Sequence, residues 1–290
     1  MRGKVLGVIG GSGVYDLPGL QKEEWFEVNT PWGKPSDKIL KASVNDNYFY
    51  FLPRHGQNHT LAPSDINYRA NIYALKSLGV EEILSFSACG SFKEELEPGS
   101  FVLVDQYIDL TKTRDSSFFG KGCIAHIPFS KPSCKRVSEN LKTLFSDLNF
   151  KFQEKGTYLT IEGPQFSSYA ESVMYKDVWH CDVIGMTNMP EAKLAREAEI
   201  CYQTIAMVTD YDCWNSTIEE VTVEEIQKIF KTNLSRIKLI LEKYISDQII
   251  PEEECKEGCN STLRNSIVTP RENWDEEIIL KMEFLLEKYL

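Results

Sequence analysis

Short apolar segments alternate along this chain with segments of helical periodicity, and no other feature constrains the fold as strongly. The apolar, strand-like segments are residues 5–9, 48–52, 83–87, 101–104, 158–161, 182–186 and 200–209. The segments with helical periodicity are residues 67–78, 136–148, 191–199, 223–245 and 274–289. Such alternation is typical of α/β folds, in which helices connect parallel strands. We therefore predict a single domain with a twisted, mixed and largely parallel β-sheet flanked by helices.

Polar groups that can bind an oxyanion follow several of these strands. The first strand leads into a glycine-rich turn that contains Ser12, and the second leads into Arg54 and His55. The third strand ends in the sequence 87–91 (SACGS), and Thr187 follows a later one. Ligands of open α/β sheets bind at the carboxyl ends of the strands. Each group alone could be a tight turn or a surface side chain, but together they predict one oxyanion site.

Two carboxylates follow the last predicted strand. Asp210 and Asp212 stand one residue apart, so in an extended segment their side chains share a face and can reach one ligand. The alternative is a solvated loop that leads into a helix, since Asp is common at helix starts.

Several common sites are absent from the sequence. Val8 occupies the first glycine position of a dinucleotide fingerprint ending at Gly13, and the chain contains no P-loop motif. The nucleophile elbow of serine hydrolases is also missing. Cys89 is a conceivable nucleophile, but the wall of a pocket is the favoured role for this small residue.

The net charge and the hydropathy of the chain limit the kinds of partner that it can bind. The formal net charge is −11, which argues against a nucleic-acid surface. The first thirty residues lack a signal-peptide pattern, and no apolar run approaches the roughly 18 residues that span a bilayer. We therefore expect a cytoplasmic protein without membrane or nucleic-acid partners.

The eight cysteines suggest no metal site at this level. Cys89, Cys201 and Cys213 lie in or beside apolar runs, where buried free thiols are expected, whereas Cys123, Cys134 and Cys181 follow no ligand spacing. Cys255 and Cys259 are four residues apart, without a second pair or a nearby histidine. We expect this pair to be reduced, with a disulfide as the alternative.

The sequence resembles the trimeric purine nucleoside phosphorylases, and within them the branch that cleaves methylthioadenosine. The matching segments are 8–13 (VIGGSG), 30–37 (TPWGKPSD), 54–56 (RHG) with 59–60 (HT), 88–91 (ACGS), 160–168 (TIEGPQFSS), 184–187 (IGMT) and 209–214 (TDYDCW). They occur in the family's order between residues 5 and 225, and the resemblance becomes loose after about residue 250. It implies a phosphorylase catalytic domain over residues 1–250 and a C-terminal segment and helix over residues 251–290 that pack on the same domain. We expect the polar, turn-rich residues 251–271 to link the two.

The resemblance also implies roles for individual residues. The phosphate-binding residues would be Ser12, Arg54, His55, Ser87, Ala88 and Thr187. The substrate-binding residues would be Phe166 stacking on the purine, Met186 under the ribose, and Asp210, Tyr211 and Asp212 near the base. Base and 5′-group choice would be tuned by Ser167, Val223, Ile226 and His126, the last reaching across a subunit boundary.

The implied reaction is phosphate-dependent cleavage of the N-glycosidic bond, with Asp210 as the catalytic acid. No metal or organic cofactor is implied, and inorganic phosphate is the co-substrate. The expected assembly is a homotrimer, with a homohexamer as the alternative.

Base choice remains open between two purine classes. Carboxylates accept hydrogen bonds from a 6-amino group, whereas relatives that act on 6-oxopurines carry Asn in place of Asp210. The aspartate therefore favours adenine nucleosides, and a phosphorylase for 6-oxopurine nucleosides or methylthioinosine is the alternative. A hydrolytic nucleosidase and a catalytically silent purine-binding protein are more distant rivals.

Two residues depart from the family pattern. Gly185 stands where the animal methylthioadenosine enzymes carry Asn, which predicts a missing polar contact near the base or sugar. Gln227 follows Ile226 where an apolar residue would better line a methylthio pocket.

Overall fold

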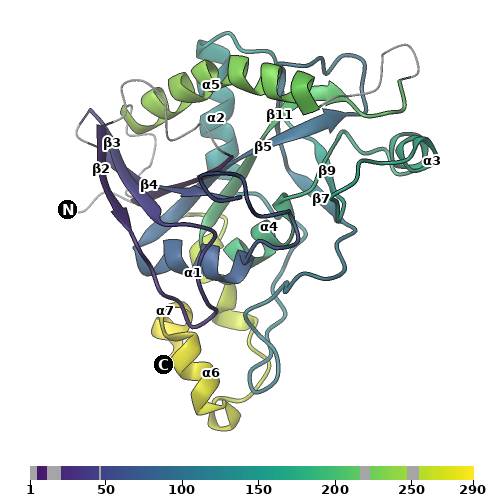
Figure 1. The fold of residues 1–290 in the computed structure, drawn as a ribbon. Coiled ribbons are helices and arrows are strands. Elements are labelled where there is room, and N and C mark those ends of the chain that lie inside the picture. The colour runs from purple at the N-terminus through teal and green to yellow at the C-terminus, as the bar shows by residue number, and fades with distance from the viewer. Residues whose placement is uncertain (1–4, 12–20, 46, 216–222, 247–254) are drawn as a thin grey trace.

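The strands of the chain join in one mixed sheet, seen edge-on between two groups of helices in Figure 1. The computed structural model describes residues 5–11, 21–45, 47–215, 223–246 and 255–290. The strands are β1 (Val5–Gly10), β2 (Gln21–Phe26), β3 (Ile39–Val44), β4 (Asn47–Pro53), β5 (Val80–Ser91), β6 (Phe101–Leu103), β7 (Gln106–Asp109), β8 (Phe152–Gln153), β9 (Thr157–Thr160), β10 (Val183–Gly185) and β11 (Cys201–Tyr211). The α-helices are α1 (Tyr68–Ser77), α2 (Lys135–Asp147), α3 (Tyr169–Val173), α4 (Asn188–Glu197), α5 (Val223–Ser246), α6 (Glu276–Lys281) and α7 (Glu283–Leu286).

The centre of the sheet is parallel. β1 pairs with β4 and β5, and β11 runs parallel to β5 along most of its length. β5 also pairs at its carboxyl end with β10, in antiparallel orientation, through Gly90 and Ser91. The carboxyl ends of β1, β4, β5 and β11 therefore meet at one edge, where the sequence predicts the oxyanion site.

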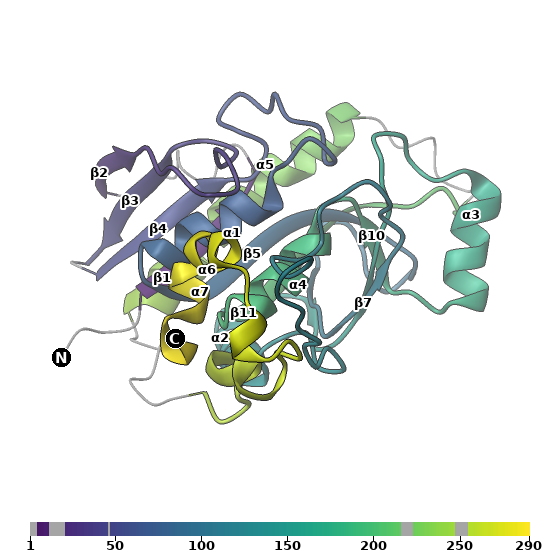
Figure 2. The same ribbon diagram turned by 90° about the horizontal axis from the view of Figure 1, so that it is seen from below.

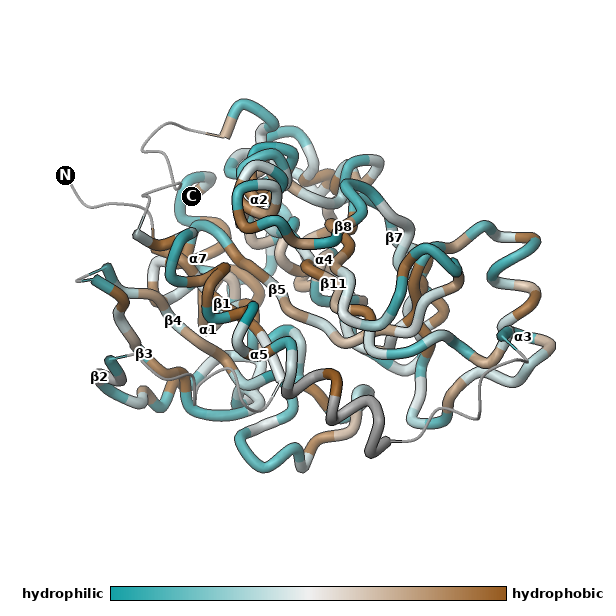
Figure 3. The backbone as a smooth tube through the Cα atoms, turned by 90° about the horizontal axis from the view of Figure 1, so that it is seen from above, coloured by the Kyte–Doolittle hydropathy of each residue, from teal (hydrophilic) through white to brown (hydrophobic). Residues whose placement is uncertain are grey.

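Two hydrophobic clusters cover the two faces of the sheet. One joins the strands to α2 and α5 through buried residues such as Phe145 and Ile240. The other joins them to α1, α4 and the C-terminal segment through residues such as Ile72, Ala195 and Met282. Figure 2 shows the second group of helices from below, and Figure 3 shows the apolar character of β1, β4 and β5. Burial of these strands on both faces accounts for their continuous apolar runs.

Local signals explain individual boundaries. The Asn67 side chain caps α1 by accepting a hydrogen bond from the Ala70 N–H, and Gly79 follows the helix with φ of 82°.

The predicted α/β fold is confirmed. The antiparallel strands β2 and β3 were not predicted, because β2 is mostly polar and the apolar residues of β3 are interrupted by Lys41 and Ser43.

The C-terminal region departs from the predicted linker and helix. The described residues from 255 on are not an exposed linker, because Cys255, Cys259 and Leu263 are buried against the body on which the segment was expected to pack. The helix predicted over residues 274–289 is broken into α6, α7 and a 3-10 turn at Glu287–Tyr289. Among the described residues, no helix combines the length and apolar character needed to cross a bilayer.

Candidate functional site

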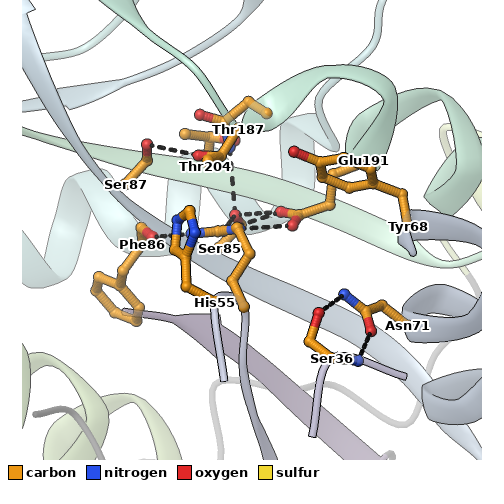
Figure 4. Close-up of polar contacts among 12 residues, drawn as sticks. Ser36, His55, Tyr68, Asn71, Ser85, Phe86, Ser87, Thr187, Glu191 and Thr204 are labelled. Atoms are coloured by element: carbon orange, nitrogen blue, oxygen red, sulfur yellow. Dashed lines mark hydrogen bonds and ion pairs between the residues drawn. The ribbon is translucent and has the colours of Figure 1, made fainter. Parts of the chain in front are cut away.

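Arg54 lies directly after β4 and is buried beneath the sheet edge. Its Nε is 2.8 Å from Glu191 Oε2, and its Nη2 is 2.7 Å from Ser85 Oγ. Its Nη1 donates to the Phe86 carbonyl oxygen at 2.9 Å. Arg54 and Glu191 have exposed side-chain fractions of only 2% and 1%, so they form a buried ion pair between β4 and α4. The partners of the guanidinium, Glu191, Ser85 and Phe86, are labelled in Figure 4.

His55 is held in one neutral form by its neighbours. Its Nδ1 lies 2.9 Å from the Leu61 carbonyl oxygen, which can only accept, so Nδ1 carries the proton. Burial lowers the pKa of His55 to about 4, against a smaller raising effect of the Leu61 carbonyl. The ring stacks on His59 with 4.3 Å between centroids. At neutral pH Nε2 is therefore an acceptor.

Hydroxyl groups from three segments meet beside this pair of residues. Ser87 Oγ lies 3.3 Å from Thr187 Oγ1 and 2.9 Å from the Tyr158 hydroxyl. Ser87 also lies 3.3 Å from the Ala88 carbonyl oxygen. Since Arg54 bonds to Phe86, the residue before Ser87, the structure brings together the predicted groups from β4, β5 and the turn after β10 (Figure 4). Ser12, the remaining predicted phosphate ligand, lies outside the described residues.

The two aspartates lie where β11 leaves its regular pairing. The register between β11 and β5 shifts between Val208 and Asp210, so Thr209 is the extra residue of a β-bulge. The Thr209 hydroxyl donates to Asp210 Oδ2 at 2.7 Å. A Cβ at Gly90 would lie 2.9 Å from Asp210 Oδ1, so glycine there gives the carboxylate room beside β5.

Burial shifts both carboxyl groups in the same direction. Burial raises the pKa of Asp210 to about 6, the Asp212 charge adds to this, and the Thr209 hydroxyl opposes it. Burial also raises the pKa of Asp212, against the hydroxyls of Ser172 and Ser167. Asp212 Oδ2 is buried without a hydrogen-bond partner among the described residues. The pair thus offers one carboxyl that is readily protonated and one acceptor without a partner.

The loop before α3 brings an aromatic ring and a hydroxyl to the same side. The Ser167 carbonyl oxygen accepts from Cys213 Sγ at 3.3 Å, which ties this loop to the end of β11. Phe166, the residue before Ser167, remains 53% exposed. The Tyr211 hydroxyl donates to the Glu94 carbonyl oxygen at 2.9 Å.

Comparison with known proteins identifies the family of this fold and site. The profile described as "Phosphorylase superfamily" matches residues 5–246. The chain belongs to the phosphorylase superfamily.

Individual relatives agree with this assignment over nearly the whole chain. S-methyl-5'-thioadenosine phosphorylase of Bradyrhizobium diazoefficiens is 47% identical over 286 residues, covering 99% of this chain and 98% of the relative. The Geobacter sulfurreducens protein of the same name is 44% identical and covers 99% of both chains. A crystal structure of methylthioadenosine phosphorylase from an antarctic soil metagenomic library superimposes with a TM-score of 0.91 at 40% identity, covering 99% of this chain and 100% of its own. Methylthioadenosine phosphorylase from Schistosoma mansoni in complex with adenine gives a TM-score of 0.84 at 34% identity, covering 91% and 98%. The resemblance seen in the sequence is confirmed.

The phosphorylase also uses a buried arginine that its sequence did not reveal. Arg114 Nη1 donates to the carbonyl oxygens of Met186 and Met189, each at 2.7 Å. Its Nη2 donates to the Glu162 carbonyl oxygen at 2.8 Å, and its Nε lies 3.2 Å from Glu162 Oε1. Arg114 therefore fixes the segment that carries Met186 against the one that leads to Phe166. Only its charge in an otherwise loop-like segment could have drawn attention to it.

Gly185 shows how this phosphorylase fills the space of the side chain that it lacks. A Cβ at Gly185 would lie 1.7 Å from the Tyr158 hydroxyl oxygen, and Tyr158 is fully buried. That hydroxyl is bonded to Ser87 Oγ. Tyr158 therefore fills the space that a side chain at position 185 would occupy, and the missing polar contact near the base or sugar stays a prediction.

Replacing Gly185 by alanine is expected to destabilise the protein by about 1–3 kcal/mol and to lower its activity, because the added methyl group overlaps Tyr158. Urea unfolding and steady-state kinetics would measure both effects. Gly120→Ala is the matched control, since a Cβ there meets no atom within 4 Å. Equal stability of the two variants would show that Tyr158 moves aside freely.

Other predicted residues are not brought to this edge. The His126 N–H donates to the Ser266 carbonyl oxygen at 2.8 Å, so His126 lies against the C-terminal segment. Val223 and Ile226 belong to α5, but their side chains lie outside the described residues. Cys89 is buried, and burial raises the pKa of its thiol well above its usual value. A thiol in this state suits the wall of a pocket rather than a nucleophile.

Proposed function

We propose that this phosphorylase cleaves S-methyl-5'-thioadenosine with inorganic phosphate, giving adenine and 5-methylthioribose 1-phosphate in a salvage reaction. The observation that carries the proposal is Asp210, a carboxyl group with a pKa raised to about 6, at the sheet edge that also holds Arg54 and Ser87. The full-length similarity to proteins named for this activity supports it.

The phosphate would lie between His55, Ser87, Ala88 and Thr187, above the buried Arg54. Arg54 supplies positive charge from below, and its Nη1 carries two N–H groups, of which the Phe86 carbonyl oxygen takes one. A phosphate oxygen then attacks C1′ while the bond from C1′ to N9 breaks, and the bonding electrons pass to the purine. The phosphate dianion also faces the developing positive charge of the sugar, so no covalent enzyme intermediate is needed.

Asp210 would protonate the departing purine. The electrons that reach the base raise the basicity of N7, and the neutral carboxyl of Asp210 transfers its proton there. Asp212, whose Oδ2 lacks a partner among the described residues, would accept from the 6-amino group of adenine. This donor requirement favours 6-aminopurines over the alternative class, 6-oxopurine nucleosides or methylthioinosine.

The remaining contacts are assigned by the resemblance. Phe166 would stack on the base, Met186 would pack under the ribose, and Ser167 and Tyr211 would border the base pocket. Val223 and Ile226 would line the methylthio group.

We further propose that the site is completed by a second copy in a homotrimer. Residues 166–178, which include α3, form an arm on which apolar side chains are exposed. Tyr169 is 60% exposed, Val178 is 67% exposed, and Phe166 is exposed as well. This arm projects from the body in Figures 1 and 2. Exposed apolar residues gathered in this way are typical of an interface. His126, which lies far from its own chain's sheet edge, would reach the 5′ pocket of the neighbour. The mass of the particle by light scattering tests the trimer, and a monomer at assay concentration would contradict it.

The function is tested by following adenine release from S-methyl-5'-thioadenosine with and without phosphate. We expect release only with phosphate, and faster than cleavage of inosine. Release that does not depend on phosphate would identify a nucleosidase. Inosine cleavage without adenine release would identify the 6-oxopurine alternative, and binding without turnover would identify a silent purine-binding protein.

The pH dependence follows from the acid role of Asp210. The active form is protonated, and the pKa of Asp210 is raised to about 6 in the folded protein. We expect kcat/KM for methylthioadenosine to fall above about pH 6, approaching tenfold per pH unit, with phosphate dianion saturating at each pH. Asp212→Asn removes a negative charge that raises this pKa, so it should move the falling limb to lower pH. A limb that does not move in this variant would assign it to another group.

A further inference from the structure

Four cysteines from distant parts of the sequence converge in the core of the described structure. Cys134 precedes α2, Cys201 begins β11, and Cys255 and Cys259 lie in the C-terminal segment. All four are buried, with exposed fractions between 0% and 5%. Their sulfur atoms all lie within 4.8 Å of one another, and Cys134 Sγ is 3.7 Å from Cys255 Sγ.

This spacing fits one tetrahedral metal ion. Zinc–sulfur bonds of about 2.3 Å in a tetrahedron place the sulfur atoms about 3.8 Å apart. A disulfide would require a separation of about 2.0 Å. The thiolates around an iron–sulfur cluster lie farther apart, because several metal ions separate them. We propose that Cys134, Cys201, Cys255 and Cys259 bind a structural zinc ion.

The surroundings supply charges that suit such a centre. A zinc ion with four thiolates carries a net charge of about −2, which burial makes costly without cations nearby. Arg196 Nη1 lies 3.4 Å from Cys259 Sγ. Arg136 interacts with Cys201, and its Nε and Nη1 are buried without a hydrogen-bond partner among the described residues. The Nη2 of Arg136 lies 2.5 Å from Glu82 Oε2. The charged groups beside the cysteines are therefore two guanidinium groups and one carboxylate, whose negative charge offsets one of the two positive charges.

The site is closed and remote from the chemistry. Four sulfur ligands leave no open position for substrate, which is typical of structural zinc. Cys201 and Asp210 lie at opposite ends of β11, about 30 Å apart at the usual rise per strand residue. The zinc would therefore stabilise the protein without taking part in glycosidic cleavage.

The zinc would fasten the C-terminal segment to the body. Cys255 and Cys259 belong to that segment, whereas the other two ligands belong to the central domain. The same segment holds the His126 loop, through Ser266 and a bridge between Ala125 and Ile267. If the metal is lost, we expect the C-terminal segment and the loop that carries His126 to become less firmly attached to the body together.

The test is metal analysis of the untagged, full-length protein, purified under reducing conditions without chelator. We expect elemental mass spectrometry to find about one zinc ion per chain. The double variant Cys255→Ser, Cys259→Ser should lose it, whereas Cys181→Ser, which changes a buried cysteine outside the cluster, should retain it. Retention of zinc by the double variant, or less than about a tenth of an ion per wild-type chain, would overturn the proposal.

Cobalt substitution keeps the test independent of the variants. Protein produced with cobalt in place of zinc should show the intense visible and sulfur charge-transfer bands of tetrahedral cobalt thiolate, and zinc should displace them. A cobalt-loaded protein without these bands would overturn the thiolate site. An intact mass about 4 Da below that of the reduced chain would also do so, because it would reveal two disulfides.

Discussion

Replacing Asp210 by asparagine is expected to lower kcat for methylthioadenosine by about 10²–10⁴-fold, with a much smaller change in KM. The amide can donate a hydrogen bond to N7 but cannot transfer a proton, so the loss falls on the chemical step. The raised pKa of the buried aspartate is the feature that the variant removes. Steady-state kinetics with saturating phosphate would measure the effect.

The same variant tests base selection. An amide donates to the O6 of a 6-oxopurine, so the ratio of inosine to methylthioadenosine turnover should rise in Asp210→Asn. Asp115→Asn is the control, because Asp115 is 72% exposed in a surface ion pair with Arg69. Unchanged turnover of methylthioadenosine in Asp210→Asn would remove this residue from the mechanism.

Replacing Glu191 by alanine is expected to destabilise the protein by about 3–5 kcal/mol, because it leaves the charge of Arg54 buried without its partner. The KM for phosphate should rise as well, since Glu191 fixes the guanidinium below the proposed anion site. Urea unfolding and phosphate titration would measure the two effects.

The matched control for this variant is Glu242→Ala. Glu242 forms a half-exposed pair with Lys238 one turn away on α5, with 31% and 27% of the side chains exposed. Its loss should cost less than about 1 kcal/mol. If the two glutamate variants were equally stable, the buried pair would have no special role.

The helices and strands that carry a local sequence pattern could be predicted from the sequence. The strand of residues 200–209 shows as an apolar run, and the helix of residues 67–78 shows helical periodicity and is followed by Gly79. The turn after the second strand pointed to Arg54 and His55 because charged groups at strand ends share one edge of a parallel sheet.

Long-range pairing could not be predicted in the same way. Glu191 was expected as an ordinary residue of the first turn of a helix, but it meets Arg54 across 137 positions of sequence. Tyr158 and Gly185 belong to two predicted strands, and their complementary shapes appear only when β9 and β10 pair. The four clustered cysteines follow no local spacing as a set, because three separate segments supply them. Cys213, expected to be buried, is exposed where β11 has already ended.

The fixed tautomer of His55 has a consequence for which anion can enter. Because the Nδ1–H of His55 donates to the Leu61 carbonyl oxygen, Nε2 carries a lone pair, which would face the phosphate that we propose beside His55. A hydrogen phosphate dianion can donate its own P–OH group to that lone pair, whereas sulfate has no proton to give at neutral pH. Sulfate and phosphate are nearly the same size and charge, so one carbonyl oxygen would make the site bind sulfate more weakly than phosphate without any steric barrier.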